Sequence, residues 1–133
     1  AQQGLALETV GVSNAPVRGP QVCDLGRVSD NDLSELYANA DLLVNLSSEE
    51  GFGYPVLEAI AHGTPAVVTK GSAMQEAAPA GIVATSLDPD AVASTLTSTL
   101  TALPLLRQEV HAIDRCWFNI ERMGEQLAQV LET

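Results

Sequence analysis

The chain has 133 residues, a formal net charge of −11 and only six lysine and arginine residues. Its length suits one domain, and the scarcity of cations excludes a general nucleic-acid-binding protein, because no basic patch is available to neutralise phosphates. For the same reason, an anionic ligand would be held mainly by backbone N–H groups and a helix dipole.

The cysteines and the hydropathy pattern exclude further classes of protein. Cys23 and Cys116 form neither a metal-binding spacing nor a disulfide framework. No run approaches the ~20 apolar residues of a membrane span, and the N-terminus carries no signal-peptide pattern. We therefore expect a cytoplasmic protein without a transmembrane segment. Because residue 1 is Ala1 rather than Met, we also expect the chain to begin inside a longer polypeptide.

Strand and helix signals alternate along the chain. Ser29 is expected to cap one helix, and Asp88 followed by Pro89 is expected to open another. Pro55 suits the first position of a helix that ends at Gly63. Strands are predicted at 5–12, 22–25, 41–46, 65–69 and 82–84. Helices are predicted at 29–40, 55–63, 73–78 and 88–102, from Pro104, and from Trp117 onward.

This alternation predicts an α/β protein. Strands that alternate with helices form a parallel sheet covered by helices on both faces, because each connection must cross over the sheet. The continuous apolar run at 41–46 is typical of a buried parallel strand. We expect residues 1–133 to form a single domain with a Rossmann-like parallel sheet.

The turn between the predicted strand 41–46 and the following helix is the strongest candidate site. Ligands of open α/β sheets bind beyond the carboxyl ends of the strands. Gly51 and Gly53 allow close backbone approach there, and the following helix contributes its N-terminal N–H groups. Glu50 and Glu58 stand on either side of the glycines. Ionised carboxylates only accept hydrogen bonds, so they would pair with hydroxyls and leave an anion to the backbone. The spacing alone is equally consistent with two ordinary acids near a helix N-terminus.

Residues 50–68, which read EGFGYPVLEAIAHGTPAVV, resemble the E-x7-E signature of retaining glycosyltransferases of the GT-B fold, in the large family 4 group. The resemblance extends to residues 25–41 (LGRVSDNDLSELYANAD), to 71–76 and to 81–83, and covers about residues 21 to 120. It implies that this chain is similar to the C-terminal, donor-binding half of a GT-B fold, shortened at its N-terminus. The N-terminal acceptor-binding domain would be missing from the chain.

The resemblance assigns roles to the residues of the turn. Glu50 would act as the catalytic-site carboxylate that binds donor sugar hydroxyls. Phe52 and Gly53 would give backbone N–H groups to the sugar or the phosphate. Val56 and Leu57 would offer N–H groups near the diphosphate.

The same resemblance covers the nucleoside end of the donor. Glu58 would hold the ribose hydroxyls, and Gly26 and Arg27 lie where the family's nucleobase loop lies. Arg27 suits stacking on a planar base, but pairing with Asp30 is an equally simple role for it.

The implied activity is transfer of a hexose, with retention, from a UDP-, GDP- or ADP-sugar to an acceptor that the sequence does not identify. The family needs neither a metal nor a cofactor. The implied partners are the nucleotide sugar and the missing acceptor-binding domain, through which the protein could associate peripherally with a membrane. The isolated chain is expected to be inactive. Two alternatives remain: a non-catalytic module that binds nucleotide sugars, and a purely structural interaction domain.

Overall fold

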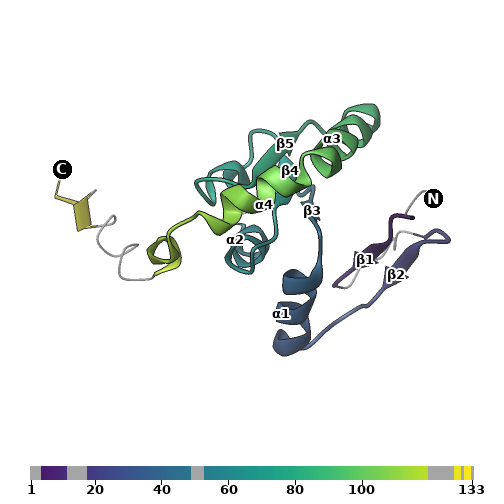
Figure 1. The fold of residues 1–133 in the computed structure, drawn as a ribbon, viewed down its shortest axis with the longest axis horizontal. Coiled ribbons are helices and arrows are strands. Elements are labelled where there is room, and N and C mark those ends of the chain that lie inside the picture. The colour runs from purple at the N-terminus through teal and green to yellow at the C-terminus, as the bar shows by residue number, and fades with distance from the viewer. Residues whose placement is uncertain (1–3, 12–17, 49–52, 120–127, 130, 133) are drawn as a thin grey trace. The chain divides into compact units, whose positions relative to one another are not determined.

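The computed structural model describes residues 4–11, 18–48, 53–119, 128–129 and 131–132. The chain divides into two compact units, Ala1–Leu36 and Tyr37–Thr133. Each unit contains its own parallel sheet (Figure 1). The sequence predicted one parallel sheet, whereas the structure has a two-stranded sheet in the first unit and a three-stranded sheet in the second.

The first unit pairs β1 (Leu7–Thr9) with β2 (Val22–Asp24) in parallel. Both strands are shorter than predicted. At the carboxyl end of the pair, the Asp24 carboxylate accepts hydrogen bonds from the Thr9 hydroxyl at 3.0 Å and from the Gly26 N–H at 3.1 Å. This one carboxylate therefore ties the ends of both strands to the loop that follows β2.

Helix α1 (Asp30–Asn39) follows that loop and runs across the boundary of the two units. Its start was predicted correctly, because the Ser29 hydroxyl accepts a hydrogen bond from the Asp32 N–H at 3.1 Å. Its last turn, from Tyr37 onward, belongs to the second unit.

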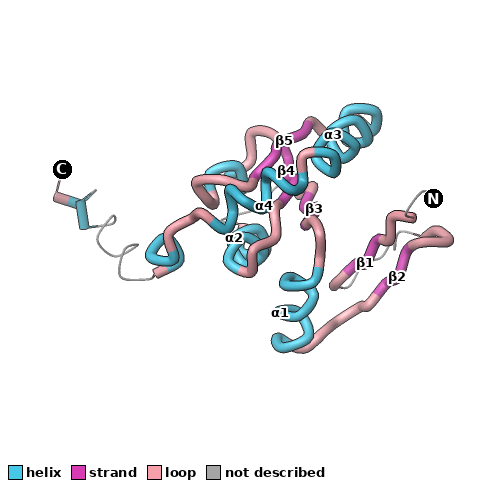
Figure 2. The backbone as a smooth tube through the Cα atoms, viewed as in Figure 1, coloured by secondary structure: helices cyan, strands magenta, loops and turns pink. Residues whose placement is uncertain are grey.

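The second unit is built around the parallel strands β3 (Leu43–Asn45), β4 (Ala66–Thr69) and β5 (Ile82–Thr85), in that order across the sheet. Helix α2 (Tyr54–Ala61) connects β3 to β4, and the short 3₁₀ helix η1 (Ala73–Glu76) lies between β4 and β5. After β5 come α3 (Pro89–Thr101), α4 (Leu103–His111) and the 3₁₀ helix η2 (Arg115–Phe118) (Figure 2). All four residues of β4 are buried, as a central strand requires.

Helices cover both faces of this second sheet. Alternate residues of a strand point to opposite faces. On one face, Ala66 and Val68 belong to a buried cluster with Val56 and Ile60 of α2 and with Val110 of α4. On the other face, Val67 is fully buried. β5 carries Thr85 opposite Thr69, on the Val67 side, and the Thr95 hydroxyl of α3 donates to the Thr85 hydroxyl at 3.2 Å. The α/β, Rossmann-like arrangement of parallel strands and covering helices is thus confirmed.

The predicted C-terminus of α2 and the predicted start of α3 are also confirmed, whereas α2 begins at Tyr54, one residue before the predicted first position at Pro55. Gly63 has a φ of +87°, and its N–H donates to the Ile60 carbonyl at 2.9 Å, while the Thr64 N–H donates to the Ala59 carbonyl at 2.9 Å. These two bonds form the Schellman motif that ends a helix at a left-handed glycine. At the start of α3, the Asp88 carboxylate accepts a hydrogen bond from the Ala91 N–H at 3.0 Å.

Two predicted helices differ from the structure. The segment predicted as a helix at 73–78 is a 3₁₀ helix of four residues. Trp117 lies inside η2 rather than at the start of an α-helix, and most of the helix predicted after it falls outside the described residues. Among the helices that the structure describes, none has both the length and the apolar character needed to cross a bilayer.

Candidate functional site

The candidate turn begins where β3 ends, at the carboxyl edge of the three-stranded sheet. The Asn45 side chain accepts a hydrogen bond from the Ser47 N–H at 3.2 Å and bends the chain away from the strand. Glu50 and Phe52 fall in the range 49–52, outside the described residues. Their predicted roles therefore stay predictions.

Gly53 stands at the N-terminus of α2 in a left-handed conformation, with φ 79° and ψ 42°. Its carbonyl accepts hydrogen bonds from the Val56 N–H at 3.0 Å and the Leu57 N–H at 3.1 Å. These are the two N–H groups that the sequence assigned to the diphosphate. In this structure the two N–H groups form the first hydrogen bonds of the helix. A phosphate bound here would therefore share these N–H groups with the Gly53 carbonyl.

The back of the turn packs against η1. A Cβ added at Gly53 would lie 2.7 Å from Met74 Cγ and 3.4 Å from Met74 Cβ. Met74 is fully buried, so it has little room to move. Two features therefore require glycine at position 53: the positive φ and the close approach of Met74.

Glu58 lies one turn into α2 and is exposed, so its carboxylate is accessible to a ligand. Its backbone carbonyl accepts the normal helical bond from the His62 N–H at 3.1 Å, and it also contacts the His62 ring nitrogen Nδ1 at 2.7 Å. The His62 ring thus caps one of the last carbonyl groups of the helix, the role expected of a histidine at a helix C-terminus.

The Glu58 carboxylate also influences a tyrosine of α1 that the sequence analysis did not single out. Burial, a hydrogen bond with the Glu58 side chain and the negative charge of that carboxylate together raise the pKa of Tyr37 to about 12. The Tyr37 residue is 8% exposed, and its ring centroid lies 5.7 Å from that of His62. The sequence offered one general indication only, that the hydroxyl of a buried tyrosine usually has a hydrogen-bond partner.

Gly26 and Arg27 lie in the first unit, directly after the carboxyl end of β2. Gly26 has a φ of +60°, and its carbonyl accepts a hydrogen bond from the Gly11 N–H at 2.8 Å. Arg27 is exposed. Both residues are described, and the structure has no salt bridge between Arg27 and Asp30. The alternative role of Arg27, an ion pair with Asp30, is therefore not formed in the structure. Its predicted role at the nucleobase stays a prediction.

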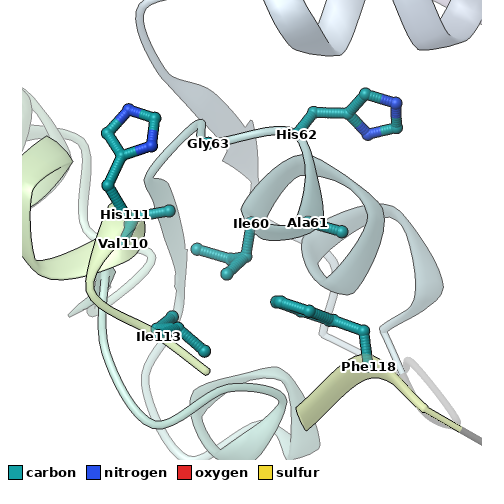
Figure 3. Close-up of a pocket in the computed structure, with 8 residues that line it drawn as sticks. All are labelled: Ile60, Ala61, His62, Gly63, Val110, His111, Ile113 and Phe118. Carbon is teal, nitrogen blue, oxygen red and sulfur yellow. The ribbon is translucent and has the colours of Figure 1, made fainter. Parts of the chain in front are cut away.

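A hollow of about 260 Å³ lies at the opposite end of α2 from the candidate turn (Figure 3). Ile60, Ile113 and Phe118 converge on it, while the rings of His62 and His111 point away from its centre. None of the residues predicted to contact a donor lines this hollow. No group of three or more histidine, cysteine, aspartate or glutamate side chains in the described ranges could hold a metal ion.

Comparisons with known proteins connect this geometry to one family. A family model described as "Glycosyl transferases group 1" matches residues 6–102. The O-antigen chain mannosyltransferase B of Escherichia coli is 42% identical over 77 residues, which are 57% of this chain and 20% of that protein. The mannosylfructose-phosphate synthase of Agrobacterium fabrum is 52% identical over 44 residues, 33% of this chain and 10% of that protein. The matched segments thus span a fifth or less of the length of these relatives.

Two solved structures share the fold. Sucrose-phosphate synthase from Thermosynechococcus elongatus superposes with a TM-score of 0.65 at 25% identity, covering 86% of this chain and 30% of that one. Anabaena Alr3699/HepE, solved in complex with UDP and glucose, superposes with a TM-score of 0.68 at 23% identity, covering 85% of this chain and 32% of that one.

Proposed function

Because this chain belongs to the group 1 glycosyl transferases, we propose that residues 1–133 form the nucleotide-sugar-binding part of an enzyme that transfers a hexose with retention. The observation that carries the proposal is the arrangement at the carboxyl edge of the three-stranded sheet. A left-handed Gly53 opens α2 there, and the exposed carboxylate of Glu58 follows one turn later. Backbone N–H groups and carboxylates side by side suit a ligand that has both phosphates and hydroxyls.

The proposed donor is a UDP-, GDP- or ADP-sugar, bound without a metal or cofactor. Glu50 accepts hydrogen bonds from the sugar hydroxyls, and Phe52 and Gly53 supply backbone N–H groups to the sugar or phosphate. The helix N-terminus attracts the diphosphate, with Val56 and Leu57 as its nearest N–H donors. Support for a nucleotide and a hexose comes from the structural neighbour that binds UDP and glucose.

The nucleoside end of the donor completes the proposal. Glu58 accepts hydrogen bonds from the ribose hydroxyls, and Gly26 and Arg27 contact the nucleobase. An ionised carboxylate can accept from two vicinal hydroxyls at once, whereas it would repel a phosphate. This difference is consistent with the positions of the two glutamates in the sequence, one before and one after the glycines.

In the proposed reaction, the bond between the anomeric carbon and the diphosphate oxygen breaks while the acceptor oxygen bonds to the same face of that carbon. The leaving phosphate takes the proton of the acceptor hydroxyl. A second, acceptor-binding domain forms the other wall of the cleft, and the protein works in the cytoplasm, where it could reach a membrane through that domain. The isolated chain would bind the donor and transfer nothing.

Substitution of Glu58 tests the proposal. In the full polypeptide that carries this chain, Glu58→Ala should weaken binding of UDP, GDP or ADP, whichever binds best, by about 10- to 100-fold, because hydrogen bonds to a charged group contribute about 1.5–3 kcal/mol. Isothermal titration calorimetry measures the affinity. Glu109→Ala, which removes an exposed helical glutamate of α4, is the matched control. Equal affinity of the two variants would contradict the ribose role.

A transfer assay separates the enzyme from a non-catalytic binding module. Labelled sugar should pass from the donor to an acceptor, and the product should keep the anomeric configuration of the donor. Donor binding without transfer or donor hydrolysis by the full polypeptide would favour the binding module. Inversion of the anomeric centre would contradict the proposed retention.

A further inference from the structure

We propose that the ammonium group of Lys70 binds the diphosphate of the donor, as a cation beside the backbone N–H groups that open α2. The inference rests on the proposed function, in which the turn before α2 binds a nucleotide sugar. It adds a charged side chain, from the loop between β4 and η1, to a site that otherwise holds the diphosphate by backbone N–H groups alone.

Lys70 directly follows the central strand β4, at the carboxyl edge of the three-stranded sheet. Its N–H donates to the Thr85 carbonyl at 2.8 Å and so continues the ladder between β4 and β5 by one residue. Because side chains alternate along a strand, Lys70 lies on the same face as Val68, which packs in the buried cluster with α2. The N-terminus of α2 lies at this edge too, because α2 follows the carboxyl end of β3.

The segment that begins with Lys70 packs beside the N-terminus of α2. Four residues after Lys70, Met74 approaches the first turn of the helix so closely that a Cβ built on Gly53 would lie 3.5 Å from Met74 Cα. Between the two, Gly71 has a φ of +79° and turns the chain away from the strand, and a Cβ added at Gly71 would meet nothing within 4 Å. The loop therefore has open space directly after Lys70, which is itself exposed.

The backbone of this loop is already used within the protein. Its three consecutive N–H groups have acceptors there: Lys70 donates to the Thr85 carbonyl, Gly71 to the Gln75 side chain and Ser72 to the Thr69 carbonyl. What the loop offers to an anion is therefore the Lys70 ammonium group, which carries a full charge and three N–H donors. Among the residues that the structure describes, Lys70 forms no salt bridge, so no ion pair among them has to break when an anion binds.

The charge of the chain makes a cation at this edge important. A protein of net charge −11 repels a diphosphate at a distance, and Glu58 adds a carboxylate one turn into α2. Arg107 of α4 does not offset this repulsion at the turn, because its guanidinium binds Asp41 at 2.6 Å, just before the amino end of β3. Lys70, at the carboxyl ends of the strands, supplies positive charge where the proposed donor carries its negative charge.

The test measures the affinity of the full polypeptide for UDP, GDP and ADP by calorimetry, at low and at high salt. The diphosphate that binds the wild type most tightly is then used with the variants. Lys70→Met keeps most of the length of the side chain and removes its charge, so at low salt it should weaken binding about three- to tenfold. At about 1 M salt, where an exposed charge is screened within about 3 Å, the loss should be smaller.

Arg107→Met is the matched control for the change in net charge. It removes one positive charge from the same unit, and the ion pair that it breaks is exposed, so the affinity should change by less than about twofold. Lys70→Arg keeps the charge and should retain most of the wild-type affinity. Thermal unfolding of each variant identifies any that fail to fold. If Lys70→Met unfolds, Lys70→Gln takes its place in the same comparison.

The outcomes distinguish this inference from the proposed function. If the wild type binds a nucleoside diphosphate and Lys70→Met binds it as tightly as Arg107→Met does, the role of Lys70 is wrong and the proposed function stands. If the wild type binds none of the three diphosphates, both are wrong. A loss that is the same at both salt concentrations, or that Lys70→Arg shares, would reveal a merely structural lysine and would also overturn the inference.

Discussion

Replacing Gly53 by alanine should destabilise the protein more than its small size suggests. Gly53 has a φ of 79°, and a residue with a Cβ loses about 1–2 kcal/mol in a left-handed conformation. The new methyl group would also lie 2.7 Å from Met74 Cγ and 3.5 Å from Met74 Cα. Overpacking of a buried site costs about 1–3 kcal/mol. The free energy of unfolding should therefore fall by about 2–5 kcal/mol in total.

Gly71→Ala separates the two contributions. Gly71 has the same φ, +79°, and a Cβ added there meets nothing within 4 Å. This variant should lose only the backbone contribution, about 1–2 kcal/mol. The difference between the two variants, about 1–3 kcal/mol, then measures the contact with Met74 alone.

Urea unfolding followed by circular dichroism measures both values, with the slope m checked for constancy across the variants. Gly53→Ala should show a clearly lower midpoint than Gly71→Ala. A difference below about 0.5 kcal/mol, the usual range of neutral surface substitutions, would refute the argument that η1 packs tightly behind the turn.

Two further predictions concern Tyr37. Thr64→Val should lower the free energy of unfolding by about 1–3 kcal/mol, because it leaves the Tyr37 carbonyl without its buried donor; Thr64→Ser, which keeps the hydroxyl, should lose less, and an equal loss would show that the bond does not matter. The second prediction concerns alkaline pH. The pKa of Tyr37 is raised from 10.0 to about 12 in the folded protein. Its stabilising contribution, at most about 3 kcal/mol, is then complete below pH 10 and is lost as the pH rises to 12, since the folded state binds more protons there. Between pH 9 and 12, the free energy of unfolding should fall less steeply with pH in Tyr37→Phe than in the wild type. Parallel curves for the two proteins would contradict a raised pKa for Tyr37.

Local chemistry explains which elements the sequence could predict. The end of α2 depends on a left-handed Gly63 and on bonds that join residues three and five positions apart, so the residues of this one segment were enough to predict it. The cap at Asp88 likewise joins it to Ala91. The strand β4 could be recognised from the apolar residues 66–68. The run at 41–46, predicted as a buried strand, forms β3 instead, and its residues are half-buried or exposed because β3 lies at the edge of the three-stranded sheet.

The partition of the strands into two sheets could not be predicted in this way. Which strand pairs with which depends on contacts between residues far apart in sequence, and the alternation of strands and helices is the same for one sheet or two. The 3₁₀ helix at Ala73–Glu76 was predicted only as a short helix, because four residues carry too little periodicity to distinguish the helix types.

For the candidate site, the sequence by itself determined the turn: two glycines, a proline and two carboxylates between a buried strand and a helix, with a resemblance to one family that the comparisons confirmed. These features depend on neighbouring residues and on backbone conformations that only glycine adopts readily. Tertiary structure alone decided what lies behind the turn. Met74 packs against Gly53, and burial together with the Glu58 carboxylate raises the pKa of Tyr37, which belongs to another helix. Neither effect follows from spacing, because each involves segments about twenty residues apart that meet only when the sheet is covered.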